Sequence, residues 1–136
     1  MNRIFWITAG LLILSLFGLF ACEKSEVRNT GLKDKEWEVV SIIESGSALP
    51  EQAENAYVMN FTNDTTYTLS LDVNNCSGSY RVKSGSKIEF SGAACTMVCC
   101  DSEYATTLVG LLPGITDYRF EAGYLILLGE GRIKLK

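Results

Sequence analysis

The stretch that decides the fold is YVMNFTNDTTYTLSLD, residues 57–72. Large apolar side chains alternate with smaller or polar ones in both halves, and the polar Asn63-Asp64 pair lies between the halves. A period of two is typical of a β-strand with one buried face, and a short polar turn between two such strands is typical of a hairpin. The stretch therefore predicts an antiparallel hairpin with one apolar face and one largely polar face.

A second hairpin is expected directly after the first, over residues 76–93. Pairing Val82 with Ile88 keeps the large apolar side chains on one face of this hairpin. A slip of one residue would instead bring a lysine opposite Val82 and scramble the two faces. The same register places Cys76 opposite Ala94.

One helix is expected over residues 101–112, because Asp101 or Ser102 can cap its start and Pro113 ends it. Residues 45–55 are expected to form a loop. The further strands are expected over Trp37–Ile43, Ile115–Phe120, Tyr124–Leu128 and Arg132–Leu135. The fold class is therefore mainly β (α+β): a small antiparallel sheet curled into a barrel or half-barrel, with one packed helix.

The start of the chain is typical of a removable leader. Arg3 supplies a positive start, residues 4–20 are almost wholly apolar, and the chain turns polar directly after Cys22. This pattern is that of a secretory signal peptide. A retained transmembrane anchor is the alternative, because the apolar run reaches the lower end of the roughly 17–25 residues that span a bilayer.

Leu19-Phe20-Ala21-Cys22 resembles the lipobox of bacterial lipoproteins, although the position of Phe20 is usually smaller. The resemblance implies a signal peptide over residues 1–21, fatty acylation (palmitate) at Cys22, a polar tether over residues 22–34 and a folded domain over residues 35–136. One acyl chain binds a membrane only marginally, so stable anchoring needs the several chains that lipoproteins carry. We therefore expect the protein in the bacterial cell envelope, lipid-anchored at the outer membrane, on its periplasmic or surface face.

Four cysteines remain in the domain: Cys76, Cys95, Cys99 and Cys100. In an exported, oxidising setting disulfides are the default, and four cysteines allow three connectivities. The sulfurs of adjacent cysteines tend to point apart, so we expect Cys76 to bond Cys99 or Cys100 and Cys95 to take the other. A thiolate site for Zn²⁺ or Cu⁺ with Met97 as a further ligand is one alternative, and free or redox-active thiols are another.

Several short motifs then follow one another in the order of a known family. They are Asn75-Cys76 before Gly78-Ser79-Tyr80, Ile88-Glu89-Phe90, Met97-Val98-Cys99 before a helix with Leu108 and Leu111, and a last strand Tyr124-Leu125-Ile126-Leu127. From about Lys35 to Leu135 the chain resembles a META (HslJ-like) domain. Two departures are Asn75-Cys76-Ser77 in place of the family's Gly-Cys-Asn, and the additional Cys95 and Cys100. The resemblance implies a small barrel-like fold with a packed helix, in a family whose members are often envelope lipoproteins linked with stress responses; it carries over no catalytic residues.

Composition excludes the commonest catalytic machinery. The chain has no histidine, and its net charge of -4 argues against binding to nucleic acid. The run Asp101-Ser102-Glu103 is better explained as a helix cap than as an acid beside a nucleophile. We therefore expect a non-enzymatic envelope lipoprotein, without cofactor or metal, that binds the membrane through its lipid and binds or supports another envelope protein. The alternative is a ligand-binding barrel for a small apolar molecule or a soft metal ion.

Overall fold

The computed structural model describes residues 31–136. The expected signal peptide, the lipidation candidate Cys22 and the tether up to residue 30 lie outside the described residues. Among the described residues, α2 is the one α-helix, and no helix there has the length and apolar character needed to cross a bilayer.

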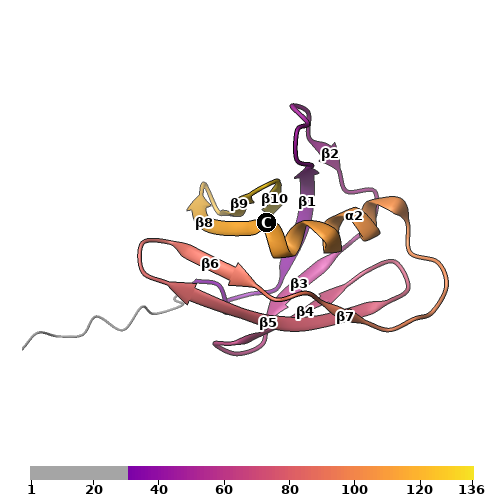
Figure 1. Cartoon of the computed structure of the whole chain (residues 1–136), viewed down its shortest axis with the longest axis horizontal. Helices are drawn as coiled ribbons and strands as arrows, with labels where there is room; N and C mark the ends of the chain where they lie inside the picture. Colours follow the sequence, from indigo (N-terminus) through magenta and orange to yellow (C-terminus); the bar gives the residue numbers. More distant parts are fainter. Residues whose placement is uncertain (1–30) are drawn as a thin grey trace, which may run out of the picture.

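Antiparallel strands dominate this part of the chain (Figure 1). The strands are β1 Trp37–Ile43, β2 Glu51–Gln52, β3 Val58–Phe61, β4 Thr66–Ser70, β5 Asn75–Lys83, β6 Lys87–Phe90, β7 Ala94–Cys95, β8 Ile115–Glu121, β9 Tyr124–Gly129 and β10 Arg132–Leu135. The helix α2 spans Glu103–Leu111, and a 3₁₀ turn, η1 Leu112–Gly114, follows it. The mainly β fold class is confirmed. The two-residue strand β2 lies where the sequence predicted a loop, and the two-residue strand β7 follows directly after the predicted second hairpin, residues 76–93.

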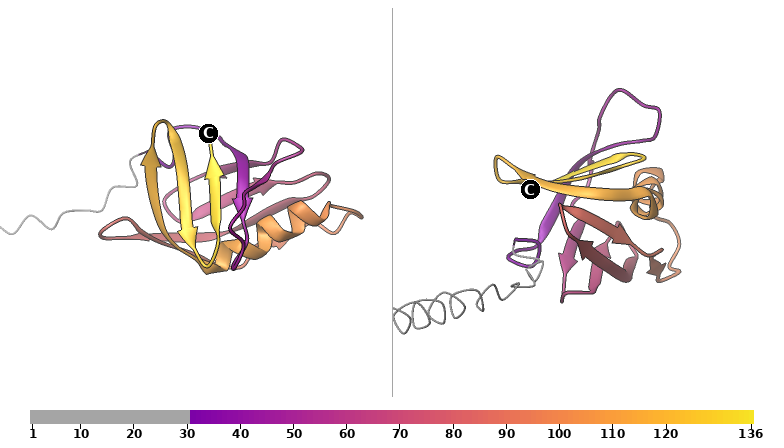
Figure 2. Two further views of the ribbon diagram at one scale, coloured as in Figure 1. Left: turned by 90° about the horizontal axis from the view of Figure 1, so that it is seen from above. Right: turned by 60° about the vertical axis from the view of Figure 1, so that its left-hand side comes forward.

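The sheet closes on itself. Its strands follow the order β10-β9-β8-β6-β5-β4-β3-β1-β2, and β10 also pairs with β1. The β1–β10 pairing joins Val39 to Leu135 and Ile42 to Ile133, whereas β6 and β8 share the single ladder pair of Lys87 with Asp117. The result is a small closed barrel, in which α2 lies between the β8–β9–β10 strands and the β3–β4–β5 strands (Figure 2).

The hairpin predicted from residues 57–72 is confirmed as β3 and β4. Phe61 pairs with Tyr67 across the ladder, and both side chains lie in the core. The turn forms because the Asn63 side-chain oxygen accepts hydrogen bonds from the backbone N–H groups of Thr65, at 2.8 Å, and Thr66, at 2.9 Å. An Asn side chain that satisfies its own turn in this way fixes the register of the strands on either side.

The second hairpin has the predicted register over most of its length, with Val82 opposite Ile88. Beyond this ladder the prediction is wrong by one residue, because Cys76 lies opposite Cys95 and not opposite Ala94. The chain between β6 and β7 holds one residue more than an uninterrupted ladder would need. This irregularity shifts the partners of Ser77 and Cys76 in β5 by one position.

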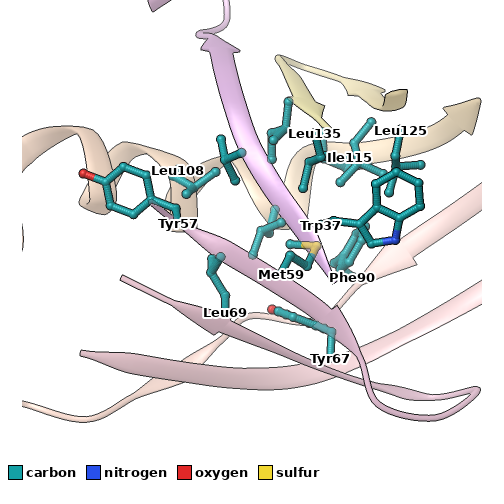
Figure 3. Close-up of a cluster of buried hydrophobic side chains, with 14 of the residues drawn as sticks. Trp37, Tyr57, Met59, Tyr67, Leu69, Phe90, Leu108, Ile115, Leu125 and Leu135 are labelled. Atoms are coloured by element: carbon teal, nitrogen blue, oxygen red, sulfur yellow. The ribbon is translucent and has the colours of Figure 1, made fainter. Parts of the chain in front are cut away.

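The helix covers a core of aromatic and aliphatic side chains. Its N-cap is Ser102, whose hydroxyl accepts a hydrogen bond from the Ala105 N–H at 3.1 Å. Leu108 of α2 belongs to one core cluster with Tyr57 and Trp37 (Figure 3). The largest fully buried side chains are Leu32, Ile42, Tyr57, Met59, Phe61, Tyr67, Leu69, Ile88, Leu108, Leu112, Ile115 and Leu125.

The packed domain begins before the expected boundary at residue 35. Leu32 is fully buried, and its backbone carbonyl accepts a hydrogen bond from the Trp37 indole N–H at 2.8 Å. Lys33 forms an ion pair with Asp64 of the β3–β4 turn. The end of the expected tether is therefore part of the folded domain.

Candidate functional site

The four domain cysteines form two disulfides, with a pairing that corrects the prediction. Cys76 bonds Cys95, and Cys99 bonds Cys100. The expected bond from Cys76 to Cys99 or Cys100 is wrong, because the extra residue before β7 brings Cys95 directly opposite Cys76 in the sheet. The remaining two cysteines are then left to each other, in the loop between β7 and α2.

The loop that carries Cys99 and Cys100 is held by a buried asparagine. The Asn74 side chain donates to the Val98 carbonyl at 2.6 Å and accepts from the Val98 N–H at 2.8 Å. It also donates to the Asp101 carboxylate at 2.6 Å. These hydrogen bonds grip the chain on both sides of the cysteine pair. We call residues 96–101 the cysteine loop.

Asp101 fixes the turn between β4 and β5 to the same loop. One of its carboxylate oxygens accepts from the backbone N–H groups of Val73, at 3.0 Å, and Asn74, at 3.2 Å. Desolvation raises the Asp101 pKa, but the hydrogen bonds from Val73 and Asn74 together outweigh it, so the pKa is lowered. The sequence offered Asp101 as a candidate helix cap; the structure gives that role to Ser102.

A second carboxylate supports the start of α2. Asp72 accepts from the Ser102 N–H at 2.9 Å and from the Ser102 hydroxyl at 2.7 Å, and the Tyr57 hydroxyl donates to it at 3.0 Å. The backbone hydrogen bond from Ser102 is the main cause that lowers the Asp72 pKa to about 2. The Ser102 hydroxyl therefore serves a carboxylate and a helix end, which is a structural arrangement and not that of an activated nucleophile.

The interior of the barrel is filled by its own side chains. Tyr57 and Tyr67 are fully buried, as is Leu108 from the helix. Tyr57 stacks on Tyr104 with ring centroids 5.2 Å apart. A filled interior opposes the alternative of a ligand held in the barrel lumen.

A shallow surface pocket of about 510 Å³ lies where the described chain begins. It is lined by Gly31, Asp34, Lys35, Trp37, Phe120 and Gly123. The Phe120 ring is 46% exposed and lies 5.8 Å from the Trp37 ring, centroid to centroid. The Lys35 ammonium lies 4.3 Å from the centroid of the Trp37 ring. We call this surface the aromatic pocket; it presents the exposed Phe120 ring beside a cation, over the buried Trp37.

The alternative function was a barrel that binds a soft metal ion. Among residues 31–136, no group of three or more Cys, Asp, Glu or His side chains is placed to hold an ion. Sequence reasoning missed both Asn74 and the aromatic pocket. Asn74 lies between the two predicted hairpins, residues 57–72 and 76–93, which is the only signal it gives. The residues next to Asn74 in the sequence do not indicate that Val98 and Asp101 are its hydrogen-bond partners.

The comparison with known families agrees with this geometry. A model of the META domain matches residues 30–135. The chain belongs to the META domain family. The match covers the whole barrel together with Leu32, in agreement with the early start of the packed domain. A search of curated proteins gives no match.

Two solved structures share the fold of this META domain. The crystal structure of a DUF4847 family protein from Bacteroides vulgatus ATCC 8482 has 13% sequence identity and a TM-score of 0.58, over 76% of this chain and 92% of that chain. The NMR structure of a protein from Burkholderia xenovorans has 16% identity and a TM-score of 0.60, over 77% of this chain and 82% of that chain. At these identities the likeness shows the fold alone.

Proposed function

We propose that this META domain protein is a non-enzymatic lipoprotein of the bacterial cell envelope, anchored at the outer membrane through Cys22. Its domain binds or supports another envelope component. The observation that carries the proposal is the filled barrel: with Tyr57, Tyr67 and Leu108 fully buried inside it, the domain is suited to act through its surface. The stress-linked setting follows from the family resemblance alone.

The aromatic pocket supports a surface role. Exposed aromatic side chains such as that of Phe120 are enriched at protein interfaces. Gly31 lies directly under the Phe120 ring, because a Cβ built on Gly31 would meet that ring at 2.8 Å. The pocket is therefore next to the segment that leads back to Cys22. If Cys22 carries lipid, the nine residues from 22 to 30 allow a separation of at most about 30 Å between the lipid and the pocket.

Anchoring is tested by Cys22→Ala. A lipoprotein signal requires this cysteine for processing, so the variant should keep its leader, as seen by intact mass, whereas the matched control Ser25→Ala should be processed as in the wild type. Metabolic labelling with a fatty acid should mark the wild type and Ser25→Ala but not Cys22→Ala. Normal cleavage of Cys22→Ala and release to the soluble fraction would overturn the lipoprotein proposal.

Partner binding is tested by a photo-reactive amino acid placed at one surface position at a time in intact cells. In place of Phe120 it should give a discrete cross-linked product with another envelope component. In place of Leu49, an apolar side chain that is 79% exposed in the loop between β1 and β2, it should give none. No product at either position, or the same product at both, would contradict recognition at the aromatic pocket.

A further inference from the structure

The two disulfides differ in their access to solvent. Cys76 is buried, with 2% of its surface exposed, and its bond to Cys95 joins two strands of the barrel. Cys99 and Cys100 are both exposed, in the cysteine loop. Next to them Met97 is 98% exposed, so its side chain does not shield the sulfurs. Cys95 is exposed as well, so the bond between Cys99 and Cys100 is open to a thiol from both residues, whereas the bond between Cys76 and Cys95 is open from one residue only.

The two disulfides also differ in what they do for stability. In the chain-entropy account a disulfide stabilises a fold by closing a loop in the unfolded chain, and longer loops give more stabilisation. The bond between Cys76 and Cys95 spans 19 positions, whereas Cys99 and Cys100 are adjacent. A bond between neighbours closes no chain loop. Its breakage therefore costs the folded state little, whereas breaking the bond between Cys76 and Cys95 removes the stabilisation that comes from closing a longer loop.

The cysteine loop keeps its shape without its disulfide. Asn74 is itself 6% exposed, and its side chain grips Val98 through two hydrogen bonds and Asp101 through one. Asp101 is tied in turn to the β4–β5 turn through the backbone of Val73. Both neighbours of the cysteine pair are thus fixed, so two reduced thiols would stay close to each other and reoxidation would be intramolecular.

The cysteine loop faces away from the point where the described chain begins. In two views it lies at the end of the domain opposite Gly31 (Figures 1 and 2). In a domain anchored through its N-terminal segment, this end is accessible to other proteins of the compartment.

We propose that Cys99 and Cys100 form a reversible thiol–disulfide exchange site whose reductant is a dithiol. A thiolate of that dithiol attacks one sulfur of the pair and breaks the bond between Cys99 and Cys100. The attacked cysteine forms a mixed disulfide with the dithiol. The other cysteine leaves as a thiolate and takes up a proton. The second thiol of the donor then attacks the mixed disulfide. Cys99 and Cys100 end as thiols and the donor ends as a disulfide, with two electrons and two protons transferred. Each molecule of the protein reacts with one molecule of the dithiol. The test of this exchange does not depend on the lipid anchor.

The test is selective reduction of the full chain, purified oxidised in detergent. The protein is exposed to dithiothreitol for increasing times without denaturant, acid-quenched, alkylated and digested, and the alkylated fraction of each cysteine is measured by mass spectrometry. We expect Cys99 and Cys100 to be reduced at least ~10-fold faster than Cys76 and Cys95, because a thiolate can attack the second bond only from the exposed Cys95 side, with the buried Cys76 as the leaving group. The far-UV and near-UV circular dichroism should not change during the fast phase. After the reductant is removed, oxidised glutathione should restore the bond between Cys99 and Cys100 within the same molecule.

Two double variants serve as controls. Cys99→Ser with Cys100→Ser should lose the fast phase and keep the native spectrum. Cys76→Ser with Cys95→Ser should keep the fast phase; if this variant does not fold, the first variant and the wild type decide. Equal rates for the two disulfides, loss of the fold together with the fast phase, or reoxidation only into mixed disulfides between molecules would each overturn the proposal. So would peptide mapping that joins Cys99 or Cys100 to Cys76 or Cys95.

Discussion

Replacing Asp72 by asparagine tests how the start of α2 is held. The Asp72 carboxylate accepts hydrogen bonds from the Ser102 N–H, at 2.9 Å, and from the Ser102 hydroxyl, at 2.7 Å. It also accepts from the Tyr57 hydroxyl at 3.0 Å and from the Asn55 amide at 2.6 Å. All four partners are donors. An asparagine in this place would turn an NH₂ group toward at least one of them and would lose the charge.

The magnitude follows from the pKa. These hydrogen bonds lower the Asp72 pKa from 3.8 to about 2, the backbone bond from Ser102 contributing most. At ~1.36 kcal/mol per pKa unit the shift corresponds to roughly 2.4 kcal/mol, and because Asp72 is partly exposed, solvent screening reduces the expected contribution to about 1 kcal/mol. A lowered pKa in the folded state stabilises above the unfolded pKa, and the contribution disappears as the pH falls through the folded value.

The assay is urea unfolding followed by circular dichroism, from pH 7 down to pH 2. At pH 7 Asp72→Asn should be less stable than the wild type by about 1 kcal/mol, and the difference should shrink between roughly pH 5 and pH 2. Glu54→Gln, which removes an exposed carboxylate from the loop before β3, is the control and should change stability little at any pH. A difference that stays constant down to pH 2, or no difference at pH 7, would refute the reasoning.

Three further substitutions test the barrel. A Cβ built on Gly129 would lie 2.7 Å from the Ile115 Cα. Because the backbone cannot move aside as a side chain can, Gly129→Ala should lower the free energy of unfolding by at least about 2 kcal/mol. An unchanged melting temperature would contradict this. Within the described part of the chain the buried Tyr104 hydroxyl has no hydrogen-bond partner. Tyr104→Phe should therefore raise the free energy of unfolding in urea by about 1 kcal/mol. A lower free energy of unfolding would contradict this. Replacing both Cys76 and Cys95 by alanine should lower the free energy of unfolding by about 3 kcal/mol, since the two cysteines are 19 positions apart. In strong reductant the wild type loses the same bond, so the difference between the two proteins should vanish. A difference that persists would show that the lost stability comes from packing.

Local patterns predicted the hairpins and the helix well. Alternation over residues 57–72 predicted β3 and β4, and the apolar face of the second hairpin predicted that Val82 pairs with Ile88. The Ser102 cap was one of two candidates, and the structure selects it. These features depend on residues close together along the chain, where side-chain period and turn chemistry act directly.

What the sequence did not predict depends on long-range contacts. The barrel closes by pairing β1 with β10, which lie near opposite ends of the domain's sequence. No sequence pattern in either strand indicates that the other is its partner. The burial of Leu32, whose carbonyl accepts a hydrogen bond from the Trp37 indole, was not predicted either. The disulfide pairing failed because one extra residue before β7 moved Cys95 into the place predicted for Ala94.

The central claim is that the five cysteines divide into one that carries lipid and four that form two bridges. Intact-mass analysis of the protein extracted from envelopes, before and after reduction, tests this directly. The account predicts loss of residues 1–21, an acylated Cys22 as the N-terminal residue, and a mass four hydrogens below that of the reduced form, with non-reduced peptides that join Cys76 to Cys95 and Cys99 to Cys100. A retained leader, an unmodified Cys22 or four alkylatable thiols in the oxidised protein would contradict it.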